Sequence, residues 1–404
     1  MRNAFLFSVT VILGLEMTSI PGSDTTAWGQ TPGPKSIATA VPKGELADFQ
    51  SRLLAATTKH LDLLINPETK VAALKGKSAD GMTALAFYRM YELTGDQKYR
   101  TAAVALADRI VEDMKATKHG VLYIKGKDSG GGESIAGGGP PALGWYASSA
   151  AYIYHKEGGK LGDIAYIATV IDNFPWNENG WWANTIDIKT GRPKEPLTKP
   201  GAINKNAVMA MCAGMVSGHV KAADSELSSR LKGKADKCLY AQIIPAQEAD
   251  GYWHYGLKGT DPKGKDVLGY FMLTTQALIG LQRSTDGYRD RTFQSALDKA
   301  CAFALKHIAP MTDPNQGPVP PADRRTAGTP THYTLADEPK RGFELGILLF
   351  AARSDAEGAK IIDCALSHFP FGDAGMDGAH AVHPSALILS LLRREASIPK
   401  SKGE

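Results

Sequence analysis

The sequence predicts an all-α fold, an (α/α)6 double-ring toroid of six helical hairpins with long loops on one face. Two patterns support this prediction. Segments that are apolar on nearly every side alternate with segments that carry charge on one side, and short connections alternate with long ones. The composition agrees with a folded soluble protein, because 43% of the 404 residues are apolar and 22% are charged.

The chain begins with the features of a secretory signal peptide. Arg2 precedes an apolar run, AFLFSVTVILGL, that is too short to span a membrane. Ala27 and Gly29 are small residues at the −3 and −1 positions of a cleavage site before Gln30. We therefore expect residues 1–29 to be a signal peptide, with an uncleaved anchor as the alternative. The expected location is secreted or periplasmic, with no membrane contact beyond the signal peptide.

The rest of the chain divides into three parts. Residues 30–44 are rich in Pro, Ser and Thr, which predicts a flexible leader. Residues 45–395 carry the alternating helices and are expected to form a single toroid domain, because each helical hairpin recurs after roughly 60 residues. Residues 396–404 are expected to be a C-terminal tail.

The inner ring is predicted from segments that are apolar on nearly all sides, since such a helix must be buried on all sides. In the first of them, Met82, Leu85, Met90 and Leu93 follow helical spacing. The Gly and Ala content of the others would let neighbouring helices approach closely. The six inner helices are expected at 82–93, 142–154, 203–220, 267–281, 342–352 and 384–392.

The outer ring is predicted from segments with one apolar stripe and one charged face. Within 97–115, for example, Ala102, Leu106 and Ile110 form a stripe, and most of the charged residues lie off it. The six outer helices are expected at 45–65, 97–115, 160–173, 223–244, 288–308 and 355–368. An open solenoid is the alternative packing, and the lack of a polar capping helix at either end favours the closed ring.

The connections predict one plain end and one elaborated end of the ring. Turns from inner to outer helices are short, as in TGDQ at 94–97. Those from outer to inner helices are long and must all emerge on the same face, at 116–141, 174–202, 245–266, 309–341 and 369–383. The inner helices point their N-termini toward this long-loop face, so their dipoles favour negative charge there.

Charge and cysteine content exclude several classes of function. The net charge is +4, and loss of Arg2, Glu16 and Asp24 with the signal peptide would raise it to +5. Because no basic run is present, we expect no nucleic-acid partner. The four cysteines, which lack a C-x-x-C pattern and fall in predicted helices, are expected to be buried free thiols: Cys212, Cys238, Cys301 and Cys364.

No motif in the sequence indicates a cofactor or a metal site. His380 and His383 have the spacing of a metal-binding pair but no third ligand, so we expect no metal. The stretch SGGGESIAGGGPP at 129–141 lacks the G-x-x-x-x-G-K-[ST] pattern of a phosphate-binding loop. We expect it to be a flexible flap over a cleft on the long-loop face.

The alternation resembles a known architecture. Twelve alternating helices with long loops on one face, and the hairpin turn in MYELTGDQKYRTAAVALADRIVEDM at 90–114, resemble the (α/α)6 toroid of the six-hairpin glycosidases and related polysaccharide lyases. The resemblance covers about 45–395 at the level of architecture, and it implies a carbohydrate-active protein. No complete catalytic signature of one family is present, so the resemblance assigns no catalytic residue.

Three long loops open in the same way, with a polar residue, a glycine and then bulky residues. These are HGVLY at 119–123, NGWW at 179–182 and DGYW at 250–253. The glycine is expected to end the helix or turn the chain. The bulky residues either plug the ring as packing or line a sugar-binding cleft, in which aromatic faces pack on sugar C–H groups. The expected substrate-binding residues are Trp181, Trp182, Asn184, Tyr252, Trp253 and Asn206.

Candidate catalytic groups gather at the same face. Asp80 and Asp266 are expected to precede inner helices, and each alone is better explained as a helix cap or a solvated charge than as a catalytic group. The full set of candidates is His254, Tyr255, Arg341, Glu344, Asp80, Asp266 and His380. Convergence at one end of the ring is what makes them informative.

We expect an enzyme that acts on a poly- or oligosaccharide, either a polysaccharide lyase or a glycoside hydrolase. Hydrolysis needs two carboxyl groups, whereas β-elimination from a uronate needs a base and groups that offset the charge of the substrate carboxylate. The supply of His and Tyr in the loops, with Asn204 and Asn206 near an inner N-terminus, favours elimination by a small margin. A non-catalytic glycan-binding toroid is the third possibility.

Overall fold

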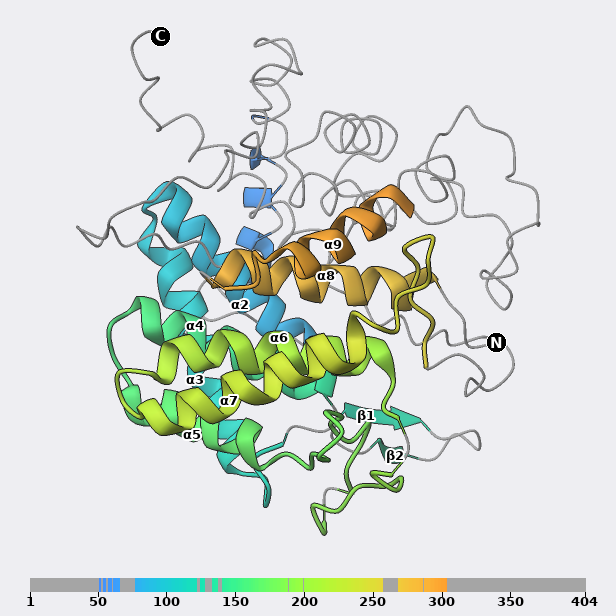
Figure 1. Cartoon of the computed structure of the whole chain (residues 1–404). Helices are drawn as coiled ribbons and strands as arrows, with labels where there is room; N and C mark the ends of the chain where they lie inside the picture. Colours follow the sequence, from blue (N-terminus) through green and yellow to red (C-terminus); the bar gives the residue numbers. More distant parts are fainter. Residues whose placement is uncertain are drawn as a thin grey trace, which may run out of the picture.

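Figure 1 shows the computed structural model of the chain, a set of helical hairpins whose long connections gather at one end. The structure describes parts of 51–65, then 77–121, 124–127, 133–136, 140–187, 189–198, 200–256, 268–285 and 287–303. The predicted helices 342–352, 355–368 and 384–392 lie outside the described residues, as does Cys364.

The described helices follow the predicted order, and each short turn joins an inner helix to an outer one. The inner helices are α2 (Lys77–Thr94), α4 (Pro140–Lys156), α6 (Ile203–Val220) and α8 (Leu268–Ser284). The outer helices are α3 (Gln97–Lys115), α5 (Leu161–Asn173), α7 (Ser225–Cys238) and α9 (Arg291–Phe303). Residues between 51 and 64 are also helical, within the first predicted outer helix.

Two predicted details differ from the structure. Helix α2 begins at Lys77, so Asp80 lies within its first turn rather than before the helix. That position suits a carboxylate, because the free N–H groups of a first turn favour negative charge. The helix predicted at 223–244 ends as α7 at Cys238 and continues as the π-helix η2 (Leu239–Ile243).

The glycine-rich stretch expected as a flexible flap is partly a strand. β1 (Ile124–Lys127) and β2 (Glu133–Ala136) pair antiparallel, with Ile124 opposite Ala136 and Lys127 opposite Glu133. The hydrogen bonds between these two strands pair backbone N–H and C=O groups that would otherwise be hydrogen-bonded to water. Within the described residues this is the one sheet of the fold.

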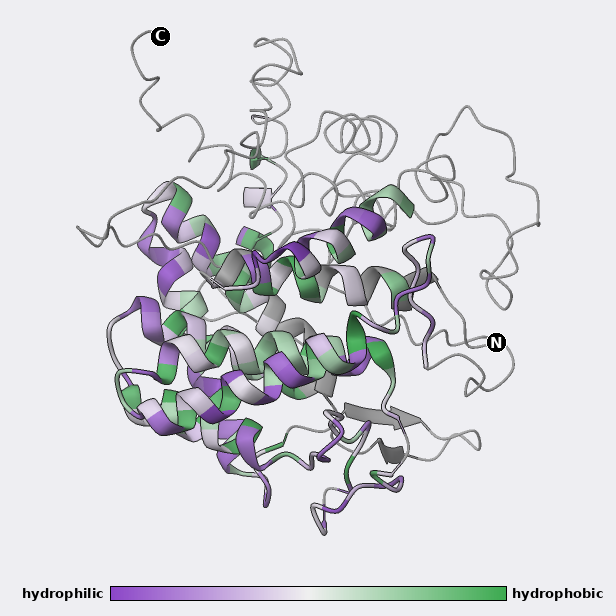
Figure 2. Cartoon of the chain, in the orientation of Figure 1, coloured by the Kyte–Doolittle hydropathy of each residue, from purple (hydrophilic) through white to green (hydrophobic). Residues whose placement is uncertain are grey.

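The inner helices pack side by side in chain order. α4 lies between α2 and α6, and α6 in turn lies between α4 and α8. Glycines allow these close approaches: a Cβ at Gly144 would lie 2.7 Å from Val208 Cγ1, and one at Gly214 would lie 2.5 Å from Leu281 Cδ1. Hydrophilic residues gather on outer helices such as α7, whereas α6 is largely apolar (Figure 2). This is the predicted arrangement of a buried inner ring and a half-buried outer ring.

The three glycines at the openings of the long loops all have the left-handed conformation that glycine favours, which confirms that they turn the chain. Their φ angles are 67° at Gly120, 101° at Gly180 and 99° at Gly251. Each also lies against the next outer helix. A Cβ at Gly120 would be 2.5 Å from Val170 Cγ2 of α5, and one at Gly180 would be 3.3 Å from the Lys237 carbonyl oxygen of α7. A Cβ at Gly251 would overlap the Lys299 carbonyl oxygen of α9.

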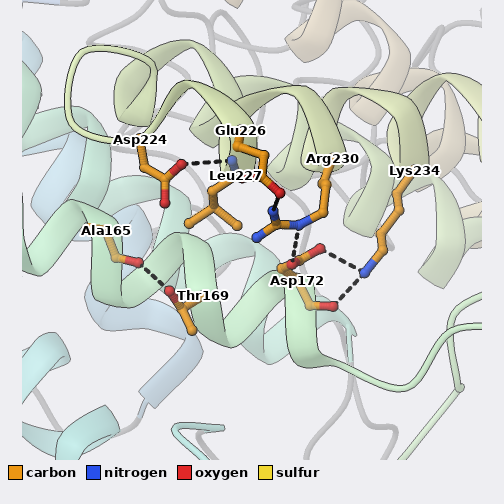
Figure 3. Close-up of polar contacts among 8 residues, drawn as sticks. All are labelled: Ala165, Thr169, Asp172, Asp224, Glu226, Leu227, Arg230 and Lys234. Carbon is orange, nitrogen blue, oxygen red and sulfur yellow. Dashed lines mark hydrogen bonds and ion pairs between the residues drawn. The ribbon is translucent and has the colours of Figure 1, made fainter.

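Charged side chains join neighbouring outer helices. Asp172, at the end of α5, accepts from Arg230 Nε at 3.0 Å and pairs with Lys234 Nζ of α7 at 2.7 Å (Figure 3). Burial raises the pKa of the Asp172 carboxyl, but the bonds from Lys234 and Arg230 outweigh it, and the pKa lies below its ordinary value. At the start of α7, the Asp224 side chain accepts from the Leu227 N–H at 2.9 Å and caps the helix.

The described cysteines confirm the prediction of buried free thiols. Cys212, Cys238 and Cys301 are buried and unpaired with one another. Burial raises the pKa of Cys212 to about 12, so this thiol stays protonated. Among the described helices, none combines the length and the apolar character that a membrane crossing requires.

Candidate functional site at the ring mouth

Two of the long connections meet at the first turn of α6, on the long-loop face. We call the region around this helix end, with the 174–202 and 245–256 segments, the mouth of the ring. The Ile203 N–H donates to the Tyr255 carbonyl oxygen at 2.8 Å, which ties the 244–256 segment to this helix end. From the other side, the Trp182 N–H donates to Asn206 Oδ1 at 2.8 Å. Both loops are therefore fixed to one helix N-terminus, and the residues that they carry surround it.

Asn206 and Asn184, expected to bind substrate, use their amides within the chain. Asn206 is fully buried, and its Nδ2 donates to the Ala202 carbonyl oxygen at 3.1 Å besides the bond from Trp182. Asn184 accepts from the Ala202 N–H at 2.7 Å and donates to Glu195 Oε2 at 3.3 Å. Such contacts hold loop backbone in place, because buried backbone groups need partners.

The aromatic residues of the loops are part of the core. The exposed fractions are 4% for Trp181, 1% for Trp182, and 0% for Tyr252 and Trp253. Trp182 packs on Trp176 with ring centroids 4.5 Å apart, and Trp253 Nε1 donates to the Ile243 carbonyl oxygen at 2.8 Å. The rings therefore serve as packing in this structure, which is the first of the two roles expected for them, and sugar binding by them stays a prediction. Their large apolar area explains the burial.

His254 and Tyr255 remain partly exposed at the mouth. The ring of Tyr252 meets the His254 ring edge-on at 5.4 Å between centroids, and so supports it from below. His254 Nε2 lies 3.4 Å from Glu248 Oε1. Glu248 was not singled out from the sequence. A turn places Glu248 beside His254, and it is closed by the Gly251 N–H, which donates to the Glu248 carbonyl oxygen at 2.9 Å. In the sequence, the Asp-Gly pair at 250–251 is what indicates this turn.

Asn204 lies on the other side of α6 from Asn206. Two residues rotate an α-helix by about 200°, and the Asn206 side chain contacts the Trp182 loop, so the Asn204 side chain points away from that loop. Only 3% of Asn204 is exposed, and its Oδ1 has no hydrogen-bond partner among the residues that the structure describes. Buried amides are nearly always bonded, so the unpartnered Oδ1 is an exception that makes Asn204 a candidate contact for a ligand.

The other catalytic candidates are placed in part or not at all. Asp80 belongs to α2, as described above, and its side chain is not described. Asp266, Arg341, Glu344 and His380 lie outside the described residues. In the described ranges no three His, Cys, Asp or Glu side chains gather in a way that could hold a metal ion.

The arrangement suits recognition of a negatively charged group combined with proton transfer. The N-terminus of α6 carries partial positive charge, and the buried amide of Asn204 lies at that end. His254, paired with Glu248, and the phenol of Tyr255 supply titratable groups beside it. The described part of the mouth thus places an amide, an imidazole and a phenol beside the Glu248 carboxylate.

Comparison with known proteins shows similarity at the level of structure only. No family model matches the chain, and no curated protein matches it by sequence. Cellobiose 2-epimerase from Spirochaeta thermophila DSM 6192 superposes with a TM-score of 0.61 and 11% identity, covering 90% of this chain and 99% of that one.

Two further solved structures are similar over nearly the same length. An unsaturated glucuronyl hydrolase specific for heparin has a TM-score of 0.54 and 12% identity, covering 87% of this chain and 98% of that one. A polysaccharide lyase has a TM-score of 0.52 and 13% identity, with 87% and 99% covered. These proteins differ in activity, so the likeness defines architecture alone. The chain has the (α/α)6 toroid fold that these solved structures share.

Proposed function

We propose that this chain is an exported enzyme that cleaves a uronate-containing polysaccharide by β-elimination at the mouth of the ring. The observation that carries the proposal is Asn204, a buried amide at the positive end of α6 with no described partner at Oδ1, on the side of the helix away from the Trp182 loop. The unpartnered Oδ1 can accept from a substrate hydroxyl, and the amide N–H groups and the helix end suit a uronate carboxylate.

The proposed reaction assigns a task to each described group. His254 takes the proton from the carbon next to the substrate carboxylate, and Glu248 holds the ring and stabilises its charged form. The electron pair released forms a C=C bond as the C–O bond to the leaving sugar breaks. The Tyr255 hydroxyl then gives its proton to the leaving oxygen. Asn204 binds the carboxylate, whose charge grows as the proton leaves.

Glycoside hydrolysis is the second candidate. Glu248, at 3.4 Å from His254, supplies one carboxylate at the mouth, and hydrolysis needs a second. The two reactions give different products. Elimination creates a C=C bond conjugated with a carboxylate, which absorbs ultraviolet light, whereas hydrolysis creates a reducing end without that absorbance. A glycan-binding toroid would give neither signal.

The test is cleavage of uronate polymers followed by ultraviolet absorbance beside a reducing-sugar assay. We expect new absorbance from the wild type, none from His254→Ala, and wild-type activity from His155→Ala. His155 lies in the last turn of α4, at the opposite end of the ring, so it is the matched control. Reducing ends without absorbance would support the hydrolase, and silence in both assays with glycan binding retained would exclude an enzyme.

His254→Ala is expected to leave the melting temperature almost unchanged. The pair with Glu248 is partly exposed, and such pairs contribute about 0–1 kcal/mol. Loss of folding in this variant would mean that His254 is structural. Export is checked separately by sequencing the mature N-terminus after expression in a secreting host, where Gln30 is the expected first residue.

A further inference from the structure

A pocket of about 480 Å³ lies on the outer flank of the ring, apart from the mouth. It is formed by the C-terminal ends of α3 and α5 and by the loop segment that follows α5, from Phe174 to Gly191. Lys115 Nζ of α3 and Asp163 Oδ1 of α5 lie 2.6 Å apart and hold the two helices together beside it. Its volume falls in the range of small-molecule sites, about 300–1,000 Å³.

The floor of this flank pocket is apolar. Val121, Val170, Phe174 and Ile186 line it, and each is almost fully buried. Tyr166 forms a half-buried wall above them. A floor of aliphatic and aromatic groups suits the C–H face of a sugar ring, as it does other flat amphipathic ligands.

The ionisable side chains at the edge of the pocket are basic, apart from the Tyr166 phenol. Lys115, Lys118 and His119 line it, and no Asp or Glu is among its lining residues. Lys115 is engaged with Asp163, and His119 Nε2 lies 3.4 Å from the Lys189 carbonyl oxygen. Lys118 is exposed and makes no ion pair with any residue in the described ranges. Its ammonium group is therefore available for an anion.

Four neutral polar side chains line the pocket, and two of them, Thr117 and Thr169, donate their hydroxyls to carbonyl oxygens of their own segments. The Tyr166 hydroxyl and the Asn173 side-chain amide both line the pocket, and neither is bonded to another described residue. Burial raises the pKa of the Tyr166 phenol, so the hydroxyl stays protonated and can both donate and accept. One ammonium, one hydroxyl and one amide over an apolar floor match a ligand with one carboxylate, several hydroxyls and an apolar face.

We propose that the flank pocket binds a uronate, a carboxylated sugar residue, outside the ring mouth. Lys118 contacts the carboxylate, Tyr166 and Asn173 contact hydroxyls, and the floor packs on the sugar ring. The pocket opens beside the C-terminal ends of outer helices, where the long connections begin, so it can hold an acidic glycan near the mouth. The proposal does not depend on the reaction, because binding on the flank is measured without cleavage.

The test is calorimetric titration of the full mature chain with glucuronate, glucose and inorganic phosphate. We expect Lys118→Ala to weaken glucuronate binding about tenfold or more, and glucose to bind at least tenfold more weakly than glucuronate. Lys221→Ala removes the same charge from an exposed position after α6, at the opposite end of the ring, and should bind as the wild type does. Tyr166→Phe should weaken glucuronate binding without loss of folding.

Asn204→Ala separates this pocket from the mouth. We expect it to leave the glucuronate binding that depends on Lys118 unchanged. Binding lost in Asn204→Ala but kept in Lys118→Ala would place the ligand in the mouth and overturn the proposal. Equal affinity for phosphate would overturn the uronate class, and absence of glucuronate binding to the wild type would overturn the site. Binding retained in a chain that cleaves no glycan would refute the proposed function alone.

Discussion

Asn204 and Asn206 show how strongly the role of a residue depends on the side of a helix that it occupies. Both are buried amides in the first turn of α6, and the sequence gives them equal standing. Asn206 holds the Trp182 backbone and the Ala202 carbonyl oxygen, whereas the Oδ1 of Asn204 has no partner among the described residues. Their substitution should therefore affect different properties of the protein.

Asn206→Ala is expected to lower the free energy of unfolding by about 1–3 kcal/mol, because it leaves the buried Trp182 N–H without its acceptor. Denaturant unfolding measures this loss. Asn204→Ala is the matched control: it should cost less stability, since its Oδ1 has no described partner, while it lowers glycan affinity or cleavage. Equal loss of stability in both variants would contradict the assignment.

Single residues of the mouth were predictable only where local chemistry was enough. The placement of His254 and Tyr255 on the long-loop face follows from the alternation of helices. The burial of Tyr252 and Trp253 does not, because a loop has no periodicity from which a buried side can be read. Glu248 reaches His254 through a turn whose geometry the sequence leaves open.

Helices were the elements best predicted, because amphipathic spacing reports their buried sides directly. The bounds of α3 and α6 agree with the prediction, as the Gly95 turn and the Asp96 cap fix the start of α3. The β1–β2 hairpin was not predicted, since glycine-rich polar sequence gives no strand pattern. The π-helix η2 depends on tertiary contacts, including the bond from Trp253 to Ile243.

Gly251 provides a test at the scale of one connection. Gly251→Ala is expected to destabilise the protein strongly, because φ is 99° and the new Cβ would overlap backbone of α9 at Lys299. The left-handed strain alone costs about 1–2 kcal/mol per residue, and the overlap adds to it. Thermal unfolding measures the change.

Gly95→Ala is the control for this substitution. Its φ is 75°, and no atom lies within 4 Å of the Cβ that alanine would add, so only the conformational strain applies. Gly251→Ala should therefore lower the melting temperature more than Gly95→Ala. The reverse order would show that the contact with α9 can adjust at little cost.

Charged contacts join the outer helices α3, α5 and α7, and these make the stability of the fold sensitive to pH. Lys115 of α3 meets Asp163 of α5, and Asp172 of α5 meets Arg230 and Lys234 of α7. The pKa of Asp172 lies below its ordinary value of 3.8. The contribution of Asp172 to the free energy of unfolding is therefore fully present above that pH. It is lost as the pH falls through the lowered pKa of the folded state.

Asp172→Asn is expected to lower stability at neutral pH by about 1 kcal/mol, as for a partly exposed ion-pair network. The difference from the wild type should shrink as the pH falls below 3.8, where the wild-type carboxyl is also losing its charge. Urea unfolding at neutral and acidic pH measures both values. A difference that stays constant with pH would mean that shape, and not charge, carries the effect.

Closure of the ring was an inference from the chain of twelve predicted helices, and the comparisons support it at the level of fold. Local patterns give the order of the helices but not the angle between successive hairpins. That angle depends on contacts between residues about 50 positions apart, such as Gly120 with Val170.

The three loop glycines have a consequence for how the circumference of the toroid is set. Gly120, Gly180 and Gly251 each lie so close to the following outer helix that no side chain fits between the loop and that helix. A closed ring has no free end, so a wider spacing between two hairpins must be matched by a change in the packing of the neighbouring hairpins. The glycines therefore act as spacers, and a side chain at any of them would push its loop away from the following outer helix.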